Sequence, residues 1–204
     1  KIFTPSMLER ATILEMNAPL TSLIENKGNG QFELHPLPTA AQLAPVYGMQ
    51  CTDVDNDGWL DLLMVGNDYG MELIMGRCDA FNGLVLRGTG PLQFEPMSLE
   101  ASGFVVPFDG KSLVQFTSKD QLQLLAGQNK AALKHFSKAL PNAVVRFAPM
   151  DAYAMVTDAA GKSYKVEAYY GNGFLSQSER SFVLPKGHQL VSVHTLSGNE
   201  RPLN

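Results

Sequence analysis

Short apolar runs separated by turn-forming residues dominate the hydrophobic pattern of this chain. The runs are six to eight residues long and rich in β-branched residues, which is typical of strands that bury one or both faces. Helical spacing is confined to two short stretches, 6–11 and 129–136. The pattern therefore predicts an all-β protein, with strands at 31–37, 59–65, 83–88, 121–127, 143–148, 152–157, 164–170 and 189–196.

Asn-Gly and Asp-Gly dipeptides lie between these runs. Such pairs readily adopt the positive φ angles that tight hairpin turns require, so antiparallel neighbours are expected. The dipeptides occur at 29–30, 57–58, 82–83, 109–110 and 172–173.

An internal repeat organises the first two thirds of the chain. NKGNGQF at 26–32 matches GTGPLQF at 88–94, and LDLLMVGN at 60–67 matches LQLLAGQN at 122–129. Both matches have an offset of 62 residues (88 − 26 and 122 − 60). A period near 60 with about four strands per period is typical of β-propeller blades. We therefore predict two four-stranded antiparallel blades in residues 1–140, followed by a small β module in residues 141–204, where the period is lost.

The stretch TDVDNDGWLDLL, residues 52–63, concentrates four carboxylates at the entrance to an apolar strand. Alternate carboxylates face inward when the backbone coils tightly, and the glycine at position 58 permits the sharp turn. With one backbone carbonyl they form an all-oxygen ligand set, which favours Ca²⁺ over Mg²⁺ or Zn²⁺. The predicted ligands of one calcium ion are Asp53, Asp55, Asp57, Trp59 (through its carbonyl) and Asp61.

This loop is not an EF-hand, because its twelfth position is Met64 rather than glutamate and its flanks are strand-like. The alternative is a solvated acidic turn without metal. Its carboxylates would repel one another, since no Lys or Arg lies between residues 28 and 76. The second repeat has lost the acidic residues, so one site is expected rather than two; the equivalent residues are Gln115, Thr117, Lys119 and Gln123.

DVDNDGWLDLLMVGN, preceded by NKGNGQFELHPLP and APVYG, resembles the FG-GAP/VCBS repeat of β-propeller proteins. YYGNGFLSQSER, residues 169–180, is similar to the ASPIC/UnbV module that commonly ends such proteins. The resemblance implies a calcium-binding loop and a location outside the cytoplasm: the cell surface, the periplasm or the medium. It also implies that this chain is a C-terminal fragment of a larger propeller, usually of seven blades. The remaining blades are then expected partners, and open blade edges favour a homodimer.

A polar cluster just after the calcium-loop strand is the candidate ligand-binding site. Polar and aromatic side chains on a connecting loop are suited to binding a sugar or a protein partner. The alternative is structural, with Arg77 in an ion pair with Asp79 or Asp68 that orders the loop. The candidate residues are Asp68, Tyr69, Arg77 and Asp79.

The composition of the chain limits the classes of partner that we expect. Of the 204 residues, 45% are apolar and 18% charged, and the net charge of −4 argues against nucleic acid. No apolar run approaches the length of a membrane-spanning helix. Cys51 and Cys78 are too few for a disulfide framework and are expected to be free, with a Cys51–Cys78 pair as the alternative.

No catalytic motif is apparent, since a GxSxG elbow is absent and the four histidines share no spacing. The expected function is a non-catalytic, calcium-stabilised binding or adhesion module for a glycan or a protein. The alternative is an accessory or catalytic part of a larger carbohydrate-active or other surface enzyme, with its site mostly in N-terminal blades.

Overall fold

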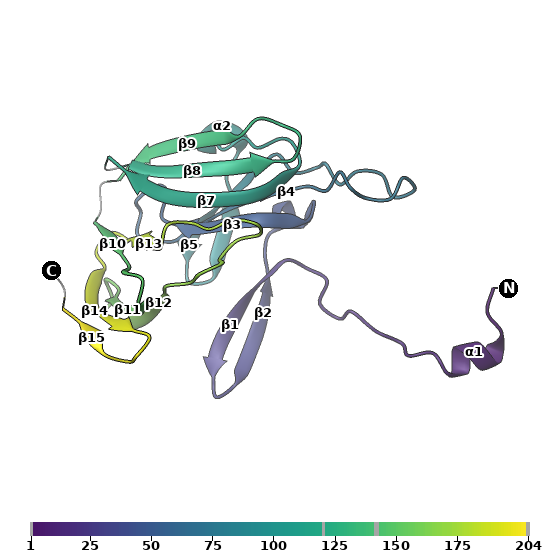
Figure 1. The fold of residues 1–204 in the computed structure, drawn as a ribbon, viewed down its shortest axis with the longest axis horizontal. Helices are drawn as coiled ribbons and strands as arrows, with labels where there is room; N and C mark the ends of the chain where they lie inside the picture. The colour runs from purple at the N-terminus through teal and green to yellow at the C-terminus, as the bar shows by residue number, and fades with distance from the viewer. Residues whose placement is uncertain (1, 120, 141–142, 203–204) are drawn as a thin grey trace. The chain divides into compact units, whose positions relative to one another are not determined.

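The computed structural model describes residues 2–119, 121–140 and 143–202 (Figure 1). The chain is all-β, with 46% of its residues in strands and 7% in helices, and its strands form several small antiparallel sheets. It divides into two compact units, Lys1–Pro36 and Leu37–Asn204. Within the described residues, no helix has the length and apolar character needed to cross a membrane.

The first unit contains a short helix and one hairpin. Helix α1 spans Pro5–Glu9, so the helical spacing near the start is confirmed. Strand β1, Ser22–Gly28, pairs antiparallel with β2, Gln31–Pro36. The predicted tight turn joins them, because Asn29 and Gly30 both have positive φ (52° and 73°), as a two-residue turn matched to strand twist requires.

The second unit begins with a four-stranded meander. After the 3-10 helix η1 (Thr39–Gln42), the sheet has the order β3-β4-β5-β6 with every neighbouring pair antiparallel. This is the arrangement expected for one blade. Its strands are β3 (Val46–Thr52), β4 (Asp61–Gly66), β5 (Leu84–Gly90) and β6 (Gln93–Pro96).

A second sheet follows helix α2, Leu99–Ser102, and has the order β7-β8-β9 in the described part of the chain. The helical spacing at 129–136 was a wrong prediction, because Lys134 already lies opposite Ala126 in the β8–β9 ladder. Tertiary pairing outweighs the weak helix propensity of so short a segment. The strands are β7 (Gly110–Ser118), β8 (Gln121–Gln128) and β9 (Lys134–Ala139).

The 62-residue repeat is reproduced in the strand registers. The four rungs of hairpin β5–β6 match four of the six rungs of hairpin β1–β2 when 62 is added to each residue number, including an irregularity at the same place. The matching rungs are Ile24↔Leu34 with Leu86↔Pro96, Glu25↔Glu33 with Arg87↔Glu95, Asn26↔Phe32 with Gly88↔Phe94, and Gly28↔Gln31 with Gly90↔Gln93. The sequence repeat is therefore also a structural repeat.

The main core of the second unit lies between its first two sheets. A Cβ on Gly48 of β3 would approach within 2.6 Å of the Leu113 backbone nitrogen on β7, so glycine permits the sheets to approach closely. The Phe104 and Phe136 rings also pack there, with centroids 4.8 Å apart. The buried cluster comprises Leu63, Val65, Val85, Phe104, Val106, Leu113, Leu122, Leu124 and Ala126.

The C-terminal residues form two further sheets, β12-β11-β14-β15 and β10-β13. The boundary predicted near residue 140 falls beside residues 141–142, which lie outside the described ranges, so the division into domains stays a prediction. The strands are β10 (Val144–Arg146), β11 (Asp151–Thr157), β12 (Ser163–Glu167), β13 (Ser181–Val183), β14 (Gln189–Thr195) and β15 (Glu200–Arg201).

A segment before β13 docks these C-terminal residues on β7. The Glu179 backbone N–H donates to the Gln115 carbonyl (2.8 Å), and the Gln115 N–H donates to Ser178 Oγ (3.0 Å). The Glu179 carboxylate then accepts from the backbone N–H and the hydroxyl of Thr117, at 2.8 and 2.7 Å. Burial raises the pKa of Glu179, but the Thr117 and Ser181 hydrogen bonds and the Arg146 charge outweigh it and lower the pKa overall.

We predict that Glu179→Gln destabilises the protein mainly at pH values where the Glu179 carboxyl group is ionised in the wild type. A lowered native pKa adds stability above the unfolded value of about 4.3, and this stability is lost as the pH falls through the native pKa. The expected cost is about 1 kcal/mol near neutral pH, or roughly 2–4 °C in Tm, because the group is partly exposed. Scanning calorimetry at about pH 7 and about pH 3.5 measures it. Glu72→Gln is the exposed control, and an equal loss at both pH values would contradict the charge-based explanation.

Candidate functional site

The acidic loop, residues 53–60, connects β3 and β4. The β3–β4 ladder ends at the Thr52↔Asp61 rung, so both ends of the loop are held in one place. Gly58 has a φ of 101° and Asn56 a φ of 64°, which lets the backbone coil back on itself. The predicted inward coil at the entrance to a buried strand is therefore present.

Three of the predicted ligands converge inside this coil. Carboxylate oxygens of Asp53, Asp55 and Asp61 lie within 4.8 Å of one another. Asp61 is completely buried and Asp53 is 7% exposed. Carboxylates are rarely buried without a compensating partner, since removing charge from water is costly.

Backbone N–H groups hold the two buried carboxylates in position. Asp53 accepts hydrogen bonds from Asn56 (2.6 Å) and Gly58 (3.0 Å). Asp61 accepts one from Val54 (2.7 Å) and one from Gly88 of β5 (2.8 Å). The loop is thus shaped by its own hydrogen bonds, and each bonded oxygen keeps a lone pair for a further ligand.

Burial raises the pKa of Asp61 above its usual value, although the Val54 and Gly88 hydrogen bonds act in the opposite direction and Asp55 and Asp53 add to the rise. A buried carboxylate beside other carboxylates favours its neutral form. A divalent cation among these oxygens would reverse that preference, and hard oxygen ligands of this kind fit Ca²⁺.

Arg87 corrects the expectation that nothing neutralises the loop. Its guanidinium reaches from β5, with Nε 2.5 Å from Asp55 Oδ2 and Nη2 2.8 Å from Asp57 Oδ2. Lys138 also donates to the Val54 carbonyl at the loop. Both cations lie outside the sequence window 28–76, and strand pairing and sheet packing bring them to the loop.

The other two predicted ligands, Asp57 and Trp59, are not part of the group of converging carboxylates. Asp57 is engaged by Arg87 and also accepts the Trp59 N–H (2.9 Å), and it is not among the three converging carboxylates. The Trp59 side chain is 44% exposed. Coordination by Asp57 and by the Trp59 carbonyl stays a prediction.

The equivalent positions in the second repeat form no comparable loop. Gln115 and Thr117 lie on β7 and Gln123 lies on β8, all within the paired ladder, and Lys119 directly follows β7. Positions that belong to the coil in the first repeat are therefore part of paired strands in the second.

We predict that Arg87→Met strengthens calcium binding at the acidic loop. The substitution removes a cation that repels the ion by about 1 kcal/mol, so affinity should rise about three- to tenfold. Isothermal titration calorimetry measures the change. The control is Arg77→Met, because Arg77 lies on a different loop. An unchanged calcium affinity in Arg87→Met would contradict the view that Arg87 competes with the ion.

The candidate ligand residues on the long loop, 67–83, separate into distinct contacts. Asp68 accepts from the Tyr47 hydroxyl (3.0 Å) and lies 3.7 Å from Lys111. The Gly70 N–H and Tyr47 hydrogen bonds lower the pKa of Asp68. Arg77 instead lies over the Tyr69 ring, 5.0 Å from its centroid.

The structural alternative for this loop is therefore different from the expected ion pair. In the described ranges, Arg77 has no carboxylate partner within ion-pair distance, and Asp79 is exposed. The base of the loop is closed by backbone hydrogen bonds between Asp68 and Cys78 (2.8 and 2.9 Å). Cys78 and Cys51 are both free.

A cleft beside the acidic loop was not expected from the sequence. It has a volume of about 430 Å³ and is bordered by the loop, by the β5–β6 turn and by C-terminal residues. The Tyr164 hydroxyl lies 2.8 Å from His188 Nδ1, and burial, followed by the Asp158 charge, raises the pKa of Tyr164 to about 12. The aromatic and charged residues that line the cleft include Asp57, Trp59, Phe94, Asp158, Tyr164, Lys186 and His188.

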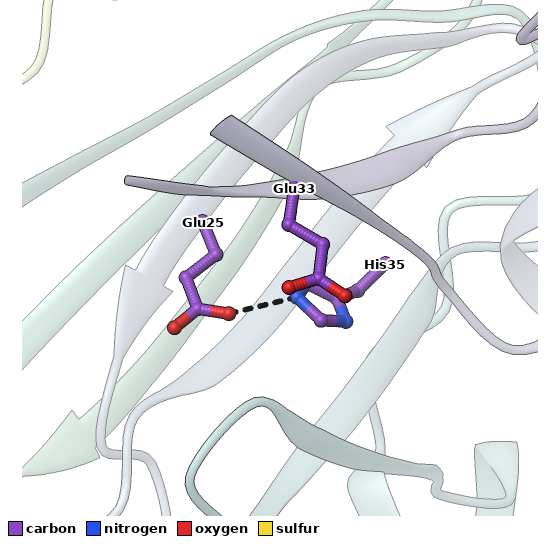
Figure 2. A group of neighbouring side chains, drawn as sticks. All are labelled: Glu25, Glu33 and His35. Carbon is purple, nitrogen blue, oxygen red and sulfur yellow. Dashed lines mark hydrogen bonds and ion pairs between the residues drawn. The ribbon is translucent and has the colours of Figure 1, made fainter. Parts of the chain in front are cut away.

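Hairpin β1–β2 carries a second cluster that the sequence reading missed. Figure 2 shows Glu25, Glu33 and His35 gathered on one face, with His35 Nε2 2.9 Å from Glu25 Oε2. The alternation of polar residues at positions 25, 27, 33 and 35 was the available signal. Lys27 lies 3.2 Å from Glu25 and 3.4 Å from Glu33 and offsets part of their charge, and we assign this face no ligand.

Comparison of the chain with models of protein families, with curated proteins and with solved structures finds no match. The function proposed below therefore depends on the residues and their geometry alone.

Proposed function

We propose that this chain is a non-catalytic, calcium-stabilised binding or adhesion module that acts outside the cytoplasm on a glycan or a protein. The observation that carries the proposal is the convergence of Asp53, Asp55 and Asp61, whose carboxylate oxygens lie within 4.8 Å of one another. These oxygens suit a hard cation, and the absence of sulfur and imidazole ligands from the loop disfavours zinc.

The role proposed for calcium is structural. The loop joins β3 to β4, and Asp61 also reaches β5 through the Gly88 N–H, so an ion here would brace three strands of one sheet. A ligand that binds only the folded state stabilises it by about 2.7 kcal/mol at 100 times its Kd. Extracellular concentrations of calcium favour such sites.

We predict one calcium site that Asp55→Asn abolishes. Asp55 is the best test because its only loop hydrogen bond is from the Asp57 N–H, which an asparagine oxygen can still accept. The wild-type chain, freed of metal with a chelator, should bind one ion and rise in Tm on titration, whereas Asp55→Asn should do neither. Calorimetry combined with thermal unfolding measures both.

Asp79→Asn is the matched control, since Asp79 is exposed and lies on the other loop. It should bind calcium like the wild type. If Asp55→Asn kept both the ion and the Tm increase, the loop assignment would be wrong. If the wild type bound no calcium, the loop would be an acidic turn neutralised by Arg87.

The cleft beside the loop supports a glycan as the ligand. A saccharide has apolar C–H faces that pack on aromatic rings and a rim of hydroxyls that hydrogen-bond to charged groups. Trp59, Phe94 and Tyr164 provide rings, while Lys186 and His188 provide polar groups. Its volume of about 430 Å³ falls within the range of small-ligand sites.

We predict that Trp59→Ala weakens glycan binding at least tenfold. Loss of a ring from a well-packed contact costs about 1.4 kcal/mol or more, which is a tenfold change. A glycan array identifies the saccharide, and calorimetry compares the variants. Tyr169→Ala, which removes a 62% exposed ring outside the cleft lining, is the control. Equal binding by Trp59→Ala and wild type would move the site away from the cleft.

The proposed context is a C-terminal fragment of an FG-GAP/VCBS-type propeller ending in an ASPIC/UnbV-like module. Support comes from the acidic loop at the entrance to β4 and from the ladder of β1–β2, which recurs 62 residues later in β5–β6. Partners would then include the other blades of the parent. The alternative, part of a larger carbohydrate-active or other surface enzyme, is favoured by the titratable groups of the cleft, Asp158, Lys186 and His188.

A further inference from the structure

The two hairpins of the 62-residue repeat differ at one edge of their first strand. We call the edge of β1 that faces away from β2, and the edge of β5 that faces away from β6, the inner edge. In the second copy, β5 is paired with β6 on one side and with β4 on the other. The β4 rungs are Leu62↔Leu86, Leu63↔Val85 and Met64↔Leu84. Subtracting 62 from the β5 residues gives Ile24, Leu23 and Ser22 of β1. In the described residues, β1 has β2 as its strand partner and no strand on this inner edge.

Exposure of the β1–β2 hairpin agrees with a missing neighbour. Ile24 is 63% exposed, whereas its counterpart Leu86 is 0% exposed. Phe32 and Leu34 share the Ile24 face and are 65% and 50% exposed. An apolar face beside an unpaired strand edge is a site for strand addition.

We propose that the inner edge of β1 binds an extended apolar strand of the β4 type, antiparallel and opposite Ser22, Leu23 and Ile24. The inference names a partner for the binding module proposed above. It depends on the repeat and not on calcium. The second copy of the hairpin acts as the template, because it already contains the bound arrangement.

The template also specifies the chemistry of the partner strand. Strand β4 is buried at every one of its six positions, so the partner should be apolar on both faces rather than alternating. It should begin with a carboxylate. Asp61 of β4 accepts the Gly88 N–H, and the counterpart of Gly88 is Asn26, whose N–H would be accepted in the same way.

The other face of the hairpin distinguishes this site from a general apolar surface. Glu25, Glu33 and His35 lie there (Figure 2), and Lys27 forms ion pairs with both glutamates. A strand placed at the inner edge gains backbone hydrogen bonds and contact with Ile24. Because this partner is apolar on both faces, its register is set by its first carboxylate at the Asn26 N–H rather than by alternation of its faces.

The experiment uses the full chain in chelator and a synthetic peptide of residues 59–67, WLDLLMVGN, made soluble by a lysine tail. Fluorescence anisotropy should show saturable one-to-one binding. Hydrogen exchange should slow at amides of β1 on addition of the peptide. A peptide with proline at the position of Leu62 should not bind. Leu62 lies opposite Leu86, whose backbone groups face β4, and proline has no N–H to donate across this pair.

Ile24→Lys should weaken peptide binding at least tenfold by placing a charge in the apolar contact. Val191→Lys, at a 52% exposed strand position of β14, is the matched control and should bind like the wild type. The proposal would be overturned if Ile24→Lys bound the peptide as tightly as the wild type. It would also be overturned if the peptide slowed hydrogen exchange only at amides outside β1. A dimeric free chain with β1 already protected would overturn it too, because a second copy would then occupy the edge. Because the chelator removes calcium throughout, the result of the peptide experiment does not depend on whether the acidic loop binds the ion.

Discussion

The buried carboxylate of Asp61 is the contact on which the acidic loop and the first sheet both depend. It lies at the first position of β4, is completely buried, and accepts N–H groups from the loop and from β5. One side chain therefore positions the loop, aligns β4 with β5 and supplies an oxygen to the converging cluster. Substituting an apolar residue here would leave two backbone donors without acceptors, which costs more than the lost bonds alone.

The same repeat serves two different purposes in this chain. In the first copy the connection between paired strands is an acidic coil that gathers carboxylates around a potential ion. In the second copy, positions 115 and 117 lie on β7 and contact the C-terminal residues instead. Thr117 donates hydrogen bonds to the Glu179 carboxylate, and the Gln115 carbonyl accepts one from the Glu179 backbone N–H.

Several ion pairs near the loops join side chains from different elements. Arg87 comes from β5 and pairs with Asp55 and Asp57, and Lys111 from β7 pairs with Asp109 and lies near Asp68. Such partly exposed ion pairs contribute little stability individually. Arg87 occupies carboxylate oxygens that a cation in the loop would need, so a cation bound there would compete with it.

The local pattern of residues was enough to predict strands, the Asn29-Gly30 turn, the acidic coil and the repeat, because each depends on neighbours in the chain. Alternation and β-branching identify a strand, and the glycine at position 58 permits a coil wherever it is placed. The tertiary structure alone decided which groups meet. Arg87 reaches Asp55 because β5 pairs beside β4, and Trp59 borders a cleft with His188 because distant segments fold together. Contacts between residues far apart in sequence leave no periodic trace, so pairing and packing determine them.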